Sequence, residues 1–167
     1  PVMVHIGDST ATTDEIMSRL RPGDIVTHAF TDRRNGIFDD AGRVHPSAIE
    51  ARRRGVLFDV GHGAGSFAFR RGEAALADGF RPDTISSDLH RFNIASPVHD
   101  LATTLSKFLL LGLSIDEVVA MATTAPAASL GSAGQTLGTL AVGAEADVTV
   151  LQLEEGRFTL TDSAGAA

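Results

Sequence analysis

Short apolar segments alternate with amphipathic segments along most of the chain. The pattern predicts four strands, at residues 2–6, 25–30, 56–60 and 84–88. Between and after them it predicts five helices, at residues 14–20, 46–55, 74–79, 100–111 and 114–123. Strand–helix units that follow one another in this way indicate a parallel sheet with right-handed crossovers. The predicted fold class is therefore α/β.

Local signals support the predicted helix starts. Thr12 with Glu15, and Ser114 with Glu117, have the spacing of a capping box, in which each side chain accepts a hydrogen bond from a free backbone N–H. Pro46 suits the first turn of a helix because it has no N–H to leave unpaired. These signals predict where the helices begin.

The pattern changes after residue 131. Residues 138–142, 147–153 and 157–161 have the composition of short strands, and the last five residues are small and form a frayed tail. We therefore expect two parts, an α/β part at 1–131 and a small all-β part at 132–167.

Composition narrows the class of protein. The chain has 167 residues, which suits one domain, with 43% hydrophobic residues and a net charge of −7. A surface for nucleic acid or for an anionic membrane needs a basic patch, which this charge argues against. The chain has no transmembrane-length apolar run and no signal-peptide pattern, so we expect a cytoplasmic protein. It also has no Cys, so a metal would need His and carboxylate ligands.

A titratable residue lies at or just beyond the end of each predicted strand: His5, His28, His62 or Asp88. A single His at a strand end is usually a structural, hydrogen-bonded residue. Four in succession favour a site, because the ends of parallel strands lie side by side about 4.8 Å apart. Imidazole and carboxylate groups suit a divalent ion such as Zn²⁺. The sequence therefore predicts a divalent metal site.

His5, His28 and Asp88 are the predicted metal ligands, and they would leave open positions for water as in catalytic zinc sites. Such an ion activates water and polarises a carbonyl group. Asp88 can also take up a proton during attack and pass it to a leaving amine, which makes it the predicted catalytic residue.

Other polar residues are predicted to contact the substrate. His62 lies between Gly61 and Gly63, whose small size permits close approach of a ligand, although the same glycines also suit a tight turn. His90 follows the fourth strand, and Arg33 lies in the long loop after the second strand, where it would hold a carboxylate.

The motifs resemble the amidohydrolase superfamily, in the branch with dihydroorotase-like deacetylases. The resemblance covers nearly the whole chain. Its motifs are Val4-His5-Ile6-Gly7-Asp8, Asp24 to Phe30, Phe58-Asp59-Val60-Gly61-His62-Gly63, Ile85 to His90, Asp100 to Phe108, Thr123 to Ala127 and Gly138 to Val148.

The resemblance implies the C-terminal half of a (β/α)₈ barrel, strands five to eight, together with strands of a small β-sandwich. It makes His5 and His28 similar to the ligands of strands five and six. Asp88 resembles the strand-eight aspartate that binds metal and shuttles the proton, and His62 matches a strand-seven position near the substrate. It also implies one or two metal ions. The family's His-x-His pair and carboxylated lysine are absent, because the chain has no His-x-His and its single lysine, Lys107, belongs to a predicted helix.

A complete barrel of this type needs about 250 residues, so four strand–helix units are about half of one. We therefore expect a portion of a longer protein, whose N-terminal half is a partner of this chain. By family analogy we also expect a homo-oligomer.

The resemblance implies a metal-dependent hydrolase, deacetylase-like, that cleaves an amide or ester bond of a small molecule with Asp88 as proton shuttle. A cyclic-amide hydrolase of the dihydroorotase or hydantoinase type is the alternative within the enzyme class. A non-catalytic half-barrel that serves as a binding or assembly module is the alternative outside it.

Overall fold

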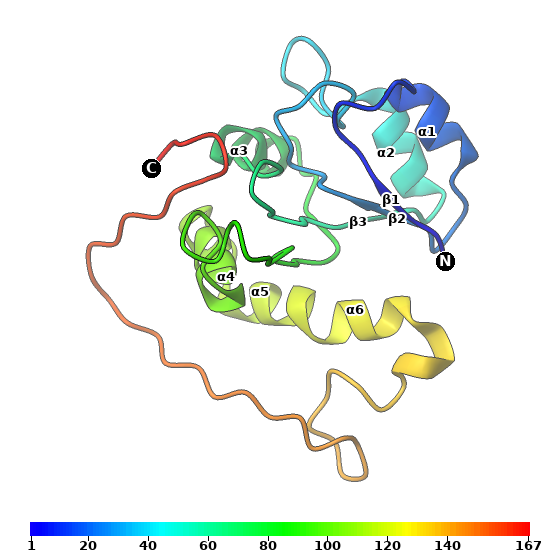
Figure 1. The fold of residues 1–167 in the computed structure, drawn as a ribbon. Coiled ribbons are helices and arrows are strands. Elements are labelled where there is room, and N and C mark those ends of the chain that lie inside the picture. The colour runs from blue at the N-terminus through cyan, green and yellow to red at the C-terminus, as the bar shows by residue number, and fades with distance from the viewer.

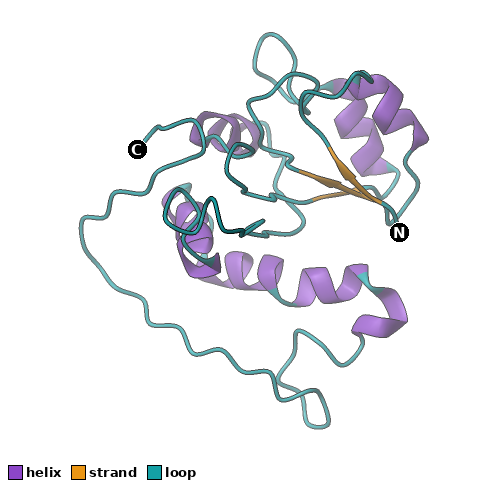
Figure 2. Ribbon diagram, viewed as in Figure 1, coloured by secondary structure: helices purple, strands orange, loops and turns teal.

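The computed structural model describes residues 1–167 and contains one parallel sheet. Strands β1 (Met3–His5), β2 (Ile25–Thr27) and β3 (Leu57–Phe58) lie in the order β1-β2-β3 (Figures 1 and 2). Both strand pairs are parallel. The predicted parallel α/β arrangement is confirmed for these strands, although each is shorter than the predicted one.

The fourth predicted strand, at residues 84–88, is not formed as a strand. The segment instead runs beside β3 and is linked to it by one parallel bridge between Asp59 and Thr84. Three backbone amides on the β3 side donate to carbonyls of the segment: Val60 to Thr84, His62 to Ser86 and Gly63 to Ser87, over 3.0 to 3.1 Å. On the side of the 84–88 segment away from β3, few backbone hydrogen bonds form. The segment is therefore an unpaired edge and does not complete the hydrogen-bond ladder of a strand.

The chain also has six α-helices and one short 3₁₀ helix. They are α1 (Thr13–Arg19), α2 (Pro46–Arg53), α3 (Phe69–Ala77), α4 (Leu101–Leu110), α5 (Ile115–Ala122), α6 (Thr124–Ser129) and η1 (Gly131–Gly134). Helices α1 and α2 lie between the strands in sequence, and the others follow β3. The capping boxes predicted at Thr12 and Ser114 are both present. None of these helices has the length and apolar content needed to cross a membrane.

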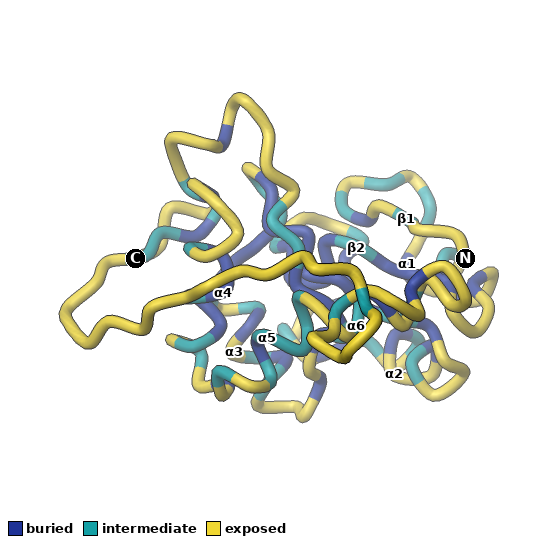
Figure 3. Tube along the Cα trace, turned by 90° about the horizontal axis from the view of Figure 1, so that it is seen from below, coloured by how far each residue is buried: buried dark blue, intermediate teal, exposed yellow.

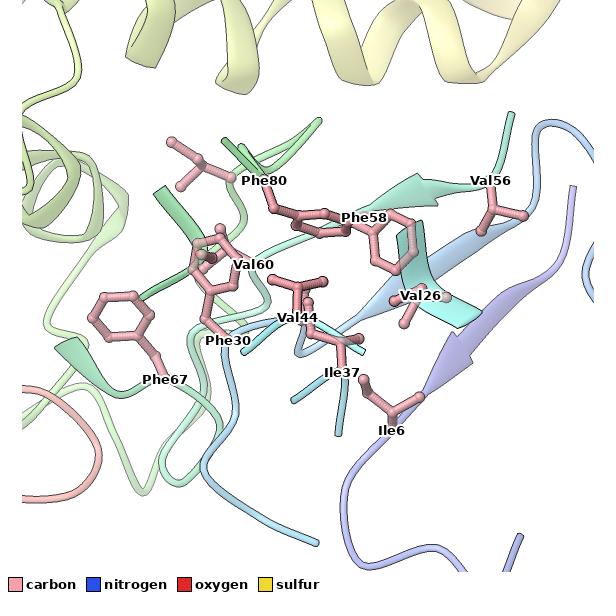
Figure 4. Close-up of a cluster of buried hydrophobic side chains, with 14 of the residues drawn as sticks. Ile6, Val26, Phe30, Ile37, Val44, Val56, Phe58, Val60, Phe67 and Phe80 are labelled. Carbon is pink, nitrogen blue, oxygen red and sulfur yellow. The ribbon is translucent and has the colours of Figure 1, made fainter. Parts of the chain in front are cut away.

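The two faces of the sheet have different surroundings. Figure 1 shows α1 and α2 on one face and α5 and α6 on the opposite side. Val26, Phe58 and Val60 belong to the buried hydrophobic cluster shown in Figure 4. Their neighbours Thr27 and Asp59 line a pocket instead. Because successive side chains of a strand point to opposite faces, the sheet separates the apolar core from a pocket that Thr27 and Asp59 line.

The strands predicted at residues 138–142, 147–153 and 157–161 are not formed. The segment from 138 to 161 is extended and mostly exposed, as Figure 3 shows. Leu140, Val142 and Val150 are among its exposed apolar side chains. A strand needs a neighbouring strand to pair its N–H and C=O groups, and no strand of this chain pairs with the segment.

The end of the chain returns to the core. Asp162 is 2% exposed, and its carboxylate accepts a hydrogen bond of 2.9 Å from the backbone N–H of Phe69, the first residue of α3. The N-cap residue of that helix, Ala68, offers no side-chain bond. Asp162 therefore caps α3 from 93 residues further along the chain.

We expect Asp162→Ala to lower the free energy of unfolding by about 1–2 kcal/mol, the usual cost of losing a helix cap. Urea denaturation followed by circular dichroism measures this loss. Asp147→Ala is the matched control, because Asp147 is an exposed aspartate in the extended segment. Equal stability of the two variants would contradict the capping role.

Candidate active-site pocket

A pocket of about 550 Å³ lies on the face of the sheet opposite the main core. Residues of β1 and β2, of the turn that follows β3, of the 84–88 segment and of α6 line it. They are Met3, His5, Ile25, Thr27, His28, Asp59, Gly61, Thr84, Ile85, Ser86, Asp88, Pro126 and Ser129. The pocket therefore contains two imidazoles and two carboxylates, and no Lys or Arg lines it.

His5 and His28 come together at the carboxyl ends of β1 and β2. Their ring centroids are 4.2 Å apart, with an edge-to-face angle of 80°. Partial burial and the neighbouring His28 ring lower the pKa of His5, while Asp88 acts in the opposite direction. A lowered pKa favours the neutral imidazole, which is the form that binds a metal ion.

The orientation of His28 is set by the glycine turn. Nδ1 of His28 lies 2.6 Å from the carbonyl oxygen of Gly61, and a carbonyl only accepts, so Nδ1 carries the proton. The other nitrogen, Nε2, then keeps its lone pair, which is the arrangement that orients histidine ligands in metal sites. His28 also has a φ of 66°, a left-handed conformation that is uncommon for a residue other than glycine.

Asp88 has the same unusual backbone conformation, with a φ of 46°. Its carbonyl accepts a hydrogen bond of 2.9 Å from the side chain of the buried Asn93. A Cβ on Gly63 would lie 2.6 Å from the Asp88 carboxylate, so only glycine fits there. Left-handed residues that the surroundings hold in place are common at functional sites.

The predicted metal ligands share the pocket, but they do not form a complete ligand set. No group of three or more His, Cys, Asp or Glu side chains in the chain is arranged to hold a metal ion. His5 belongs to the first segment of the sheet and Asp88 to the fourth. Their backbones are therefore three strand spacings apart, about 14 Å. The donor types nevertheless suit a divalent ion, because His28 presents a free Nε2 beside His5 in a pocket that Asp88 also lines.

Asp59 is a pocket residue that the sequence analysis missed. Its carboxylate is 3% exposed and accepts three hydrogen bonds, from the hydroxyls of Thr27 (2.7 Å), Thr84 (2.6 Å) and Ser86 (2.7 Å). The sequence does contain a signal for this residue, because Asp59 lies inside the apolar segment Val56–Val60. A carboxylate in such a segment is rarely buried without partners.

His62 does not line this pocket. It is fully buried and stacks on Phe67, with ring centroids 4.7 Å apart. Nζ of the equally buried Lys107 lies 2.8 Å from Nε2 of His62. Because Lys has only donors, Nε2 accepts this bond and the protonated Nδ1 donates to the carbonyl of Gly63 over 2.9 Å. His62 therefore supports the turn from within the core.

The other predicted substrate contacts also lie outside this pocket. Arg33 donates to the carboxylate of Asp8 over 2.6 Å and to the carbonyl of Gly65 over 3.0 Å, so it joins the loops that follow β1 and β3. His90 is exposed and accepts a bond from the backbone N–H of Phe92. Of the predicted contacts, only Gly61 lines the pocket.

This arrangement defines a class of protein. In parallel α/β folds the ligand site lies at the carboxyl ends of the strands, and here His5, His28 and Asp88 lie at those ends beside one pocket. The chain is therefore a parallel α/β unit with a pocket that reaches the carboxyl ends of its strands.

Comparisons with known proteins agree with this class. No protein-family model matches the chain. A deacetylase of Enterococcus faecalis is 40% identical to it over 167 residues, and a deacetylase of Agrobacterium fabrum is 38% identical over 165 residues. A crystal structure of an adenine deaminase superposes with a TM-score of 0.93 at 40% identity, and one of a dihydroorotase with 0.81 at 37% identity.

The chain is homologous to a segment of the amidohydrolases, as its motifs predicted. The matches cover 98% to 99% of this chain. They cover 45% and 40% of the two deacetylases, and 45% and 42% of the two solved chains. The chain therefore spans less than half the length of the relatives it matches.

The buried His62 predicts a pH-dependent stability. Burial lowers the pKa of His62 from its ordinary 6.5 to about 4, so the unfolded chain binds this proton more readily than the folded chain. Stability is therefore full above pH 6.5 and falls as the pH drops toward 4, by on the order of 3 kcal/mol.

Urea denaturation at several pH values between 7 and 4 measures this loss. We expect His62→Gln to show a clearly shallower decline than the unchanged protein. His90→Gln keeps His62 and should retain the original pH dependence. Parallel curves for His62→Gln and the unchanged protein would disprove the assignment.

Proposed function

We propose that this chain forms part of a metal-dependent hydrolase that cleaves an amide or ester bond of a small molecule, with deacetylation as the favoured reaction. The observation that carries the proposal is the pocket in which His5, His28 and Asp88 gather without any Lys or Arg. Two relatives named deacetylases, 38% and 40% identical over nearly the whole chain, support the choice of reaction.

His5 and His28 would hold a divalent ion, with zinc favoured by two imidazoles and a carboxylate. A divalent ion bound there supplies a Lewis acid that polarises a carbonyl group and acidifies water. Gly61 holds the proton of His28 on Nδ1, which keeps Nε2 free as a ligand.

Asp88 would bind the metal and carry the proton. Its carboxylate is exposed to the pocket, and its backbone is held by Asn93 and by the close turn at Gly63. A carboxylate fixed in this position takes a proton from the attacking water and returns it to the leaving nitrogen or oxygen.

The remaining ligands would come from outside this chain. A complete amidohydrolase adds a His-x-His pair and a carboxylated lysine, by the resemblance of the motifs. We propose that the preceding half of a cytoplasmic, homo-oligomeric protein supplies them and closes the barrel of residues 1–131, while residues 132–167 join a small β-sandwich.

A cyclic-amide hydrolase is the second candidate. The dihydroorotase structure, with a TM-score of 0.81 over 98% of the chain, favours it. Both reactions place a carbonyl carbon near the ligands and a proton on the leaving nitrogen, so His5, His28 and Asp88 serve either one. The substrate loops decide between them.

We expect Asp88→Asn to lower kcat on N-acetyl amides and cyclic amides by roughly 10²-fold or more, because Asn cannot carry the proton. Steady-state kinetics of the intact native protein measure this, and its thermal melting midpoint should change little because the side chain is exposed.

Asp147→Asn removes the same charge from the exposed extended segment and should leave kcat unchanged. Full turnover by Asp88→Asn would contradict the proton-shuttle role. Metal analysis of the native protein tests the broader proposal, which fails if the protein hydrolyses none of these substrates and binds no divalent metal.

A further inference from the structure

A row of residues crosses the sheet beside the predicted metal ligands, and it includes the carboxylate of Asp59. The parallel register aligns His5 with Thr27 and Val26 with Phe58, and the next residues along, Thr27 and Asp59, line the same pocket. The bridge then aligns Asp59 with Thr84. The interior rows of such sheets are usually filled by branched apolar side chains, so a carboxylate here requires an explanation.

Asp59 has no positively charged partner in the chain. None of the nine ion pairs includes it, and its three hydrogen-bond donors are neutral hydroxyls. The other pocket groups nearby are the imidazoles of His5 and His28 and the carboxylate of Asp88. A buried carboxylate is normally balanced by a cation or a metal ion.

We propose that Asp59 is a positioning residue whose negative charge strengthens the binding of a divalent cation at His5, His28 and Asp88. This inference rests on the proposed function. Asp59 lies two strands from His5 in the same row, about 10 Å across the sheet, and only one strand from the backbone of His28. At these distances one negative charge attracts a doubly charged ion and strengthens its binding, because a protein surface screens the attraction less than bulk water does.

The hydroxyls of Thr27, Thr84 and Ser86 fix the carboxylate in place. They come from β2 and from the 84–88 segment, on either side of β3, so Asp59 also joins three neighbouring segments of the sheet. A purely structural role would depend on these bonds, whereas the proposed role depends on the charge. The two roles can be separated by substitution.

Zinc titration of the metal-depleted intact native protein provides the test. We expect Asp59→Asn, which is nearly isosteric and removes the charge, to weaken Zn²⁺ binding by about tenfold or more. Thr84→Val keeps the charge and removes one hydrogen bond, so it should lower the thermal melting midpoint of the metal-free protein and leave the Zn²⁺ affinity within about twofold.

Asp24→Asn is the charge-matched control. Asp24 is 5% exposed and accepts bonds from the backbone N–H groups of Val2 and Arg21 at the opposite end of the strands. Its substitution should lower stability without changing the Zn²⁺ affinity.

Three results overturn the proposal. Unchanged Zn²⁺ affinity in Asp59→Asn, with tight binding by the unchanged protein, would refute the role of Asp59 alone. Equal weakening in Thr84→Val would show that the hydrogen bonds, not the charge, are responsible. A lack of stoichiometric Zn²⁺ binding by the unchanged protein would refute both this inference and the metal-dependent function.

Discussion

The period-two alternation of side chains along parallel strands in register is the constraint on which this structure depends. It sends Val26 and Phe58 into the core and places Thr27 and Asp59 on the pocket face. Because the register aligns neighbouring strands, residues far apart in sequence fall into rows across the sheet. The site at the strand ends and the polar row beneath it both follow from this one geometric rule.

Two buried polar networks support the strand ends from different sides. Asp59 joins β2, β3 and the 84–88 segment through hydroxyl groups on the pocket face. On the core side, Lys107 holds His62, and the hydroxyl of Ser163 donates to the carbonyl of Gly63 over 3.0 Å. Buried networks whose members are satisfied make a structure rigid, so the turn at Gly61–Gly63 is held from both faces. That turn orients His28 and packs against Asp88.

Much of the fold was predictable from local signals. The β1, β2 and β3 strands, five of the helices and both capping boxes depend on short-range patterns, and the structure contains them. Helix α3 begins at Phe69, five residues before its predicted start, and α6 was not predicted. The strands predicted at 138–161 are not formed in this chain, because strand formation needs a pairing partner, which no local pattern reveals. The strand order predicted that His5, His28 and Asp88 share one pocket. It did not predict how far apart they lie across the four segments of the sheet.

The sequence by itself determined the parallel α/β class, the kinship with amidohydrolases and the polar residues at the strand ends. Only the tertiary structure decided which of these residues face the pocket. His62, predicted to touch the substrate, is buried against Lys107, while Asp59, inside an apolar segment, lines the pocket. The physical reason is that a strand turns at its end. A left-handed residue such as His28, or the glycines at 61 and 63, changes which face the next side chain meets.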